Sequence, residues 1–187
     1  MIQKTLATCL LASGLLIGCS SSVTLYTSPQ AEVVERIPSR FSSIEVLTVS
    51  LPTYASGEEL LVTSTDGTLV TGNTLWADDP TREITLSLAR SLTEITGARV
   101  APQPWPFDSV AEARVDVRVE RLLASNGTLL LRGQYFVAAT DGESPDRARL
   151  FDLSRPLSPE ASLQEILAAR SAVLAELAVM IARSGLR

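Results

Sequence analysis

A strict alternation of valines with charged residues gives the clearest strand signal in this sequence. It runs from Arg114 to Glu120 and predicts a strand over residues 113–124 with one buried and one exposed face. Asn126-Gly127 follows and is typical of a two-residue type I′ turn, so residues 128–139 are expected to return as the antiparallel partner. Asp66-Gly67 is a second hairpin signal. Shorter β-prone runs predict further strands over residues 43–51, 60–63, 68–71, 99–101 and 147–153.

The first hairpin turn also predicts which residues of its two strands face each other. Counting back from Asn126-Gly127 places Val117 opposite Phe136, and Val115 opposite Ala138, on the buried face. Asp116 and Glu120 then fall on the other face of the hairpin. We interpret that face as a solvated surface of mixed charge, with a carboxylate site as the less favoured alternative.

Apolar residues at helical spacing predict two amphipathic helices. The first begins at Asp79-Pro80, which offers a capping side chain and then a proline in the first turn, and it ends at Gly97. The second is expected to begin at Ser158-Pro159-Glu160. We expect it to pack on the sheet, with a coiled-coil seam as the less favoured alternative. Its apolar stripe consists of Leu163, Ile166, Leu167, Val173, Leu174, Leu177 and Ile181.

The predicted order of elements is β-β-β-α-β-β-β-β-α. This order favours an α/β (α+β) fold, built as a two-layer sandwich in which a mixed β-sheet is covered by two amphipathic helices. The chain has 187 residues, a length that fits one domain of roughly 100–200 residues.

The N-terminus has the pattern of a bacterial lipoprotein signal. Lys4 precedes an apolar run that is shorter than the roughly 20 residues of a membrane span. Leu16-Ile17-Gly18-Cys19 resembles a lipobox, in which the cysteine becomes the lipid attachment site. We therefore expect a signal peptide over residues 1–18, a lipidated N-terminus and tether over 19–40, and one domain over 41–187. A buried N-terminal helix is the less favoured alternative.

Lipidation of Cys19 would anchor the chain to a bilayer. In enterobacterial lipoproteins, which this N-terminus resembles, an aspartate after the lipidated cysteine retains the protein at the inner membrane. Ser20 occupies that position here. The expected location is therefore the periplasmic face of the outer membrane, with the inner membrane as the alternative.

The amino-acid composition excludes several kinds of chemistry. The sequence has no histidine, which removes Ser-His-Asp and Cys-His catalysis and histidine-ligated metals. Its two cysteines are Cys9, within the signal peptide, and Cys19. No phosphate-binding glycine loop or G-x-S-x-G motif occurs. We expect no catalytic residue, no metal and no cofactor, and the net charge of −5 disfavours nucleic acid as a partner.

A few side chains remain as candidate site residues. The carboxylate pairs Glu58-Glu59 and Asp78-Asp79 are interpreted as an exposed loop and a helix cap, in preference to catalytic or calcium sites. Trp76 and Trp105 are assigned to the core or to a partner interface, in preference to a ligand groove. Aromatic residues are enriched at binding hot spots, so both are candidate interface residues.

The order of several short motifs resembles one family, the ABC-type transport auxiliary lipoproteins (the PqiC-like lipoproteins). Besides the lipobox and the terminal helix, these motifs are Ile44-Glu45-Val46-Leu47-Thr48-Val49, Leu51-Pro52-Thr53-Tyr54, Leu75-Trp76-Ala77-Asp78 and Gly133-Gln134-Tyr135. The proline-rich loop around Trp105 and the long C-terminal helix depart from the family pattern, which leaves the identity of the partner open.

The resemblance implies a function that composition does not. It implies a non-catalytic accessory subunit of an MCE-type system, in which MCE-domain proteins conduct phospholipids between the two membranes. The implied partners are an MCE-domain protein with an inner-membrane permease and ATPase, or a Pqi-type integral protein. The resemblance also implies a homo-oligomeric ring. The alternative is an envelope lipoprotein that binds a small lipid or peptide in a monomer pocket.

Overall fold

The chain folds as two β-sheets and three helices over the residues that the computed structural model describes, 24–63 and 68–187. The larger sheet has the strand order β5-β2-β6-β7-β8. Its strands are β2 (Ser43–Val46), β5 (Arg99–Pro102), β6 (Ala113–Ser125), β7 (Thr128–Ala139) and β8 (Arg147–Pro156). Both β2 pairings are parallel, whereas β6, β7 and β8 form an antiparallel meander.

A second, smaller sheet has the strand order β1-β4-β3. Its strands are β1 (Thr24–Tyr26), β3 (Glu59–Thr63) and β4 (Leu69–Trp76). The sequence predicts one mixed sheet, and the separate small sheet corrects that prediction. Within it, β1 pairs in parallel with β4, and β3 pairs with β4 as an antiparallel hairpin. The predicted hairpin strands are confirmed, while Asp66-Gly67 lies outside the described residues.

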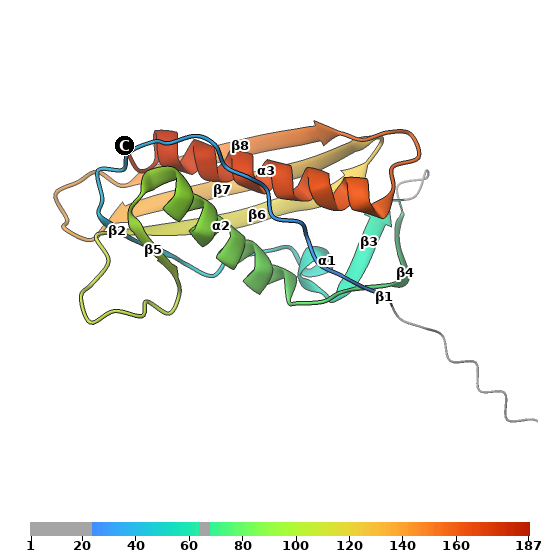
Figure 1. Cartoon of the computed structure of the whole chain (residues 1–187), viewed down its shortest axis with the longest axis horizontal. Coiled ribbons are helices and arrows are strands. Elements are labelled where there is room, and N and C mark those ends of the chain that lie inside the picture. Colours follow the sequence, from blue (N-terminus) through green and yellow to red (C-terminus); the bar gives the residue numbers. More distant parts are fainter. Residues whose placement is uncertain (1–23, 64–67) are drawn as a thin grey trace, which may run out of the picture.

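The helices are α1 (Thr53–Ser56), α2 (Pro80–Thr96) and α3 (Leu163–Ser184). Figure 1 shows α2 and α3 over one face of the five-stranded sheet. Their buried residues join those of the sheet in one hydrophobic core. The predicted two-layer α+β sandwich is therefore confirmed, and the α3 stripe packs on the sheet as expected. The short helix α1 was not predicted.

Both predicted ends of α2 are confirmed. The Asp79 side chain accepts a hydrogen bond from the Arg82 backbone N–H at 2.7 Å, and Pro80 occupies the first helical turn. Gly97 ends the helix with a φ of 68°, a left-handed conformation that glycine adopts without strain.

The predicted start of α3 is wrong. The helix begins at Leu163, and Ser162 provides the N-cap by accepting from the Glu165 backbone N–H. The Glu165 carboxylate reaches back to the backbone N–H of Ser158 at 2.6 Å. Ser158 therefore belongs to the loop that the carboxylate holds against the helix, and the helix starts one turn later than expected.

The predicted register of the β6–β7 hairpin is also wrong for Val117. The pairs next to the turn, from Ser125–Thr128 to Arg121–Arg132, have the predicted register. The register then shifts between Val119 and Arg121. Beyond this β-bulge Val117 lies opposite Tyr135, which is fully buried, and not opposite Phe136. Val115 likewise lies opposite Val137 and not opposite Ala138. A bulge adds one residue to one strand, so every pair beyond it moves by one.

The expected solvated face of β6 is confirmed. Arg118 Nη2 lies 2.7 Å from Asp116 Oδ2, and Glu120 is exposed and accepts a hydrogen bond from Gln134. These side chains form ion pairs and hydrogen bonds with one another at the surface. Their arrangement favours the structural interpretation over a carboxylate site.

Residues 24–40, which the sequence predicts to be part of the tether, pack on the domain. After β1 the chain crosses α3 and α2, as the blue segment of Figure 1 shows. Ile37 is 5% exposed and its backbone N–H donates to the Ile95 carbonyl. Arg40 bonds the Leu186 carbonyl in the same way. Residues 1–18 and Cys19 lie outside the described residues.

Candidate functional site

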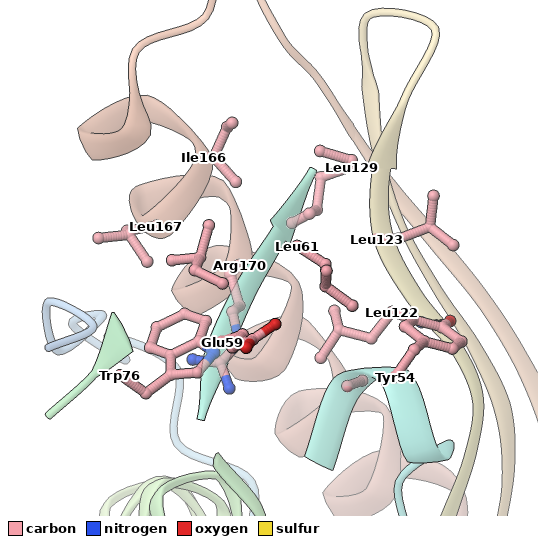
Figure 2. Close-up of a pocket in the computed structure, with 13 residues that line it drawn as sticks. Tyr54, Glu59, Leu61, Trp76, Leu122, Leu123, Leu129, Ile166, Leu167 and Arg170 are labelled. Atoms are coloured by element: carbon pink, nitrogen blue, oxygen red, sulfur yellow. Dashed lines mark hydrogen bonds between the residues drawn. The ribbon is translucent and has the colours of Figure 1, made fainter. Parts of the chain in front are cut away.

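A small pocket opens where the small sheet, α1 and the first half of α3 meet. Figure 2 shows side chains from these elements converging on it. Trp76 and Leu61 come from the small sheet, Tyr54 from α1, and Ile166 and Arg170 from α3. The end of β6 completes the lining with apolar residues. The pocket is therefore a mainly apolar junction between the two sheets.

Arg170 is the charged residue at this junction. Its side chain is 5% exposed, and its Nη1 lies 2.8 Å from Glu83 Oε2 on α2. The same nitrogen donates to Ser28 Oγ at 2.5 Å. The guanidinium carbon stands 4.3 Å from the centroid of the Trp76 ring. The buried cation thus has an anion, a hydroxyl group and an aromatic face as partners, which together compensate its lost hydration.

The electrostatic state of Arg170 follows from this environment. Burial lowers the pKa of the guanidinium from its ordinary value, while the charge and hydrogen bond of Glu83 act in the opposite direction. An arginine side chain nevertheless stays protonated in proteins. Arg170 is therefore a permanent buried charge that positions its neighbours and does not transfer protons.

The Arg170 contacts also connect segments that are far apart in the sequence. Ser28 follows β1, Glu83 lies in the first turn of α2, and Trp76 ends β4. Arg170 is a site residue that was not predicted from the sequence. An available signal was its position within the apolar stripe of the last helix, between Leu167 and Leu174.

Tyr54 gives the Leu-Pro-x-Tyr motif a structural role. Its hydroxyl oxygen accepts a hydrogen bond from the Leu122 backbone N–H at 3.1 Å. Leu122 lies just beyond the β6 bulge, where the neighbouring strand β2 has already ended. Tyr54 thus satisfies a backbone donor where the strand edge has no neighbouring strand, and it fixes α1 against the pocket.

The pocket is too small for a lipid or peptide ligand. Its cavity volume is about 50 Å³, whereas sites for drug-sized ligands have volumes of about 300–1,000 Å³. The space suits a few atoms of an apolar side chain or ordered water. Within residues 24–63 and 68–187, no group of three or more His, Cys, Asp or Glu side chains is placed to hold a metal ion.

The two tryptophans lie in different parts of the molecule. Trp76 is half-buried at the pocket and covers Arg170. Trp105 lies in the loop after β5, where its Nε1 donates to the Ser109 carbonyl and its ring meets Phe107 edge-on at 4.9 Å. The structure therefore does not bring the two candidate interface residues together.

The helix cap predicted at Asp78-Asp79 is confirmed, and Glu58-Glu59 is exposed as predicted, although Glu59 begins strand β3 and does not lie in a loop. Asp79 caps α2, and the neighbouring Asp78 forms an ion pair with Arg82. Glu58 and Glu59 are exposed at the start of β3. None of the helices in the described part of the chain is long and apolar enough to cross a membrane.

Comparison with known families identifies the chain. Residues 24–182 match the family of the ABC-type transport auxiliary lipoprotein component. The chain belongs to this family, as its motifs predicted. A comparison with curated proteins gave no match.

Solved structures confirm the fold. A crystal structure of an uncharacterized protein is 18% identical, with a TM-score of 0.69 over 87% of this chain and 97% of the other. A Xanthomonas campestris protein of the DUF330 family is also 18% identical, with a TM-score of 0.66 over 87% and 94% of the two chains. At this identity the likeness concerns the fold alone.

Proposed function

We propose that this chain is a non-catalytic docking subunit of an MCE-type system for phospholipid transport between membranes. Its family membership supports the broader part of this proposal, an auxiliary role in ABC-type transport. In the proposal a lipid on Cys19 holds the domain at the periplasmic face of the outer membrane. Its partners are an MCE-domain protein with a permease and ATPase, or a Pqi-type integral protein.

The observation that carries the docking role is the family match over a domain with a close-packed interior. The pocket at Trp76 holds only about 50 Å³, far below the roughly 300 Å³ of the smallest usual ligand sites. A carrier of lipid inside one monomer would need a larger cavity. This disfavours the Trp76 pocket as a site for a lipid or peptide within the monomer. The larger hollows, of about 410–630 Å³, lie elsewhere on the described surface.

Affinity purification of the lipidated protein from native membranes tests the proposal. We expect mass spectrometry to recover an MCE-domain protein together with components of its transporter. A Cys19→Ala variant, which lacks the attachment thiol, is the matched control for membrane-dependent capture. Recovery of one tightly bound lipid without any transporter component would overturn the proposal in favour of a lipid carrier.

The same assay tests the two candidate interface residues. In the proposal Trp105 contributes to partner binding, because the adjacent Phe107 and Val110 are 43% and 63% exposed and extend the apolar surface of its loop. Trp105→Ala should lower recovery of the MCE-domain protein. Trp76→Ala should act by loosening the Arg170 junction, so a change in its melting temperature should accompany any loss of binding. Unchanged recovery for both variants would remove both residues from the interface.

A further inference from the structure

We propose that the end of the domain formed by the small sheet, β1-β4-β3, faces the bilayer and contacts its headgroup region. We name this part the small-sheet end. The inference rests on the proposed lipid anchor at Cys19 and adds which surface of the domain lies against lipid. It follows from the reach of the chain, the position of β1 and the exposed side chains of the small sheet.

The reach of the anchor is short. β1 begins at Thr24, five residues after Cys19. A fully extended chain spans at most about 3.6 Å per residue, so Thr24 lies within about 18 Å of a lipidated Cys19. The first described strand of the domain is therefore held close to the membrane surface.

The long strand β6 shows how far the two ends of the domain lie apart. Near its C-terminal end, Leu122 lines the pocket together with Trp76, which pairs with Tyr26 of β1. At its N-terminal end, Ala113 follows the loop that carries Trp105. A strand rises about 3.3 Å per residue, so Ala113 and Leu122 are about 30 Å apart. Figure 1 shows β1 and β5 at opposite ends of the molecule.

The reach of the anchor and the distance between the two ends of the domain together restrict how the domain can lie on the bilayer. If the Trp105 loop faced the bilayer with the domain upright, β1 would stand about 30 Å away, beyond the roughly 18 Å reach of the anchor. The domain must therefore stand on the small-sheet end or lie on its side.

The upright orientation brings three exposed apolar side chains of the small sheet to the bilayer. Leu25 on β1 is 61% exposed, and Leu69 and Val70 on β4 are 37% and 40% exposed. Apolar side chains next to a lipid anchor add to membrane binding when they enter the headgroup boundary. Exposed Glu58 and Glu59 lie at the same end. Their negative charge favours zwitterionic over anionic lipid as the contacted surface.

Site-specific fluorescence in vesicles tests this orientation. The lipidated full-length protein offers no other free thiol, because Cys19 is alkylated and Cys9 leaves with the signal peptide. Leu25→Cys and Val110→Cys variants therefore take one fluorophore each, at the two ends of the domain. The labelled proteins are inserted into phosphatidylcholine vesicles that carry a spin-label quencher just below the headgroups.

We expect the label at position 25 to lose about half of its emission, because groups within about 5–10 Å of the headgroup boundary meet the quencher. The label at position 110 should keep its emission. A Val70→Cys variant repeats the first result if Leu25→Cys disturbs β1. Equal quenching at positions 25 and 110 would show a domain lying on its side and overturn the inference, as would quenching at position 110 alone.

The outcomes separate this inference from the proposed function. The vesicles contain no transport partner, so failure to recover an MCE-domain protein leaves the fluorescence result unaffected. Mass spectrometry of the N-terminal peptide reports lipidation in the same sample. A chain without lipid on Cys19 overturns the anchor and the orientation together. A lipidated chain with an unquenched label at both positions 25 and 70 overturns the orientation alone.

Discussion

The guanidinium group of Arg170 stacks on the ring of Trp76, with its central carbon 4.3 Å from the ring centroid. The contact joins the last helix to the last strand of the small sheet. Glu83 and Ser28 bind the same guanidinium group from α2 and from the segment after β1. One buried side chain thus fixes the small sheet, and with it the start of the domain, to both long helices.

Removal of Arg170 should destabilise the domain strongly. Arg170→Met keeps an apolar stem but leaves Glu83 without its cation. Breaking one partner of a buried ion pair costs about 3 kcal/mol, so we expect a decrease of this size in the free energy of unfolding. Urea denaturation followed by circular dichroism measures it.

Arg82 provides the matched control for that variant. Its ion pair with Asp78 is exposed, with side-chain exposures of 63% and 44%. Exposed pairs contribute about 0.5 kcal/mol or less, so Arg82→Ala should change the free energy of unfolding little. Equal effects of Arg170→Met and Arg82→Ala would contradict the role assigned to the buried cluster.

Loss of the Tyr54 hydroxyl should have a moderate effect on stability. Tyr54→Phe leaves the Leu122 backbone N–H without its acceptor, which costs about 1 kcal/mol of unfolding free energy. Tyr26→Phe is the control, because no hydrogen bond is found for the Tyr26 hydroxyl within the described residues. Thermal denaturation of the two variants and the parent chain gives the comparison. The assignment fails if Tyr26→Phe lowers stability as much as Tyr54→Phe.

Gly133 should not tolerate any side chain. It lies opposite the β6 bulge, and an added Cβ would stand 2.1 Å from the Arg118 carbonyl oxygen and 3.0 Å from the Val119 Cα. Backbone atoms cannot move aside as a flexible side chain can, so we expect Gly133→Ala to cost about 3 kcal/mol. Gly57→Ala, where nothing lies within 4 Å, should be nearly neutral. A stable Gly133→Ala protein in chemical denaturation would refute the close approach of the two strands.

Acid should weaken the start of α3. Hydrogen bonds from the Ser158 backbone N–H, and then from its hydroxyl, lower the pKa of Glu165 from its ordinary value of 4.5. A lowered pKa in the folded state adds stability above pH 4.5, and this contribution is lost as the pH falls through the folded-state value. Glu165→Gln should therefore reduce stability at pH 7, and the difference from the parent chain should shrink in acid.

Denaturation curves at pH 7 and pH 3 measure this effect, with Glu160→Gln as the control on an exposed side chain of the same loop. The loss of stability caused by Glu165→Gln could instead be the same at both pH values. That result would show that the carboxylate charge does not hold Ser158.

The sequence predicted those elements whose structure depends only on neighbouring residues. The valine alternation of β6 and the Asp79-Pro80 and Gly97 ends of α2 required nothing beyond neighbouring residues. The start of α3 was also readable, because Ser162 and Glu165 form an S-x-x-E capping pattern. Ser158-Pro159, four residues earlier, also matches the pattern of a helix start. Ser158 instead donates hydrogen bonds to the Glu165 carboxylate, a role that depends on the folded loop.

Long-range contacts account for the remaining differences. At the β6 bulge, Gly133 of β7 closely approaches the β6 backbone, and the Tyr54 hydroxyl accepts a hydrogen bond from Leu122. Both residues come from other elements. The strand β1 has three residues, and it exists because β4 lies beside it. The Arg170 junction likewise assembles Ser28 and Glu83 from distant positions. The place of Arg170 in the apolar stripe of α3 indicates its burial, but no spacing in the sequence reveals these partners.

The location of the MCE-domain protein tests the central claim most directly. Inner and outer membranes are separated by density from cells that carry the parent chain, lack it, or carry Cys19→Ala. The docking account predicts that the share of MCE-domain protein in the outer-membrane fraction falls in the second and third strains. An unchanged distribution in cells that lack the chain would contradict the account.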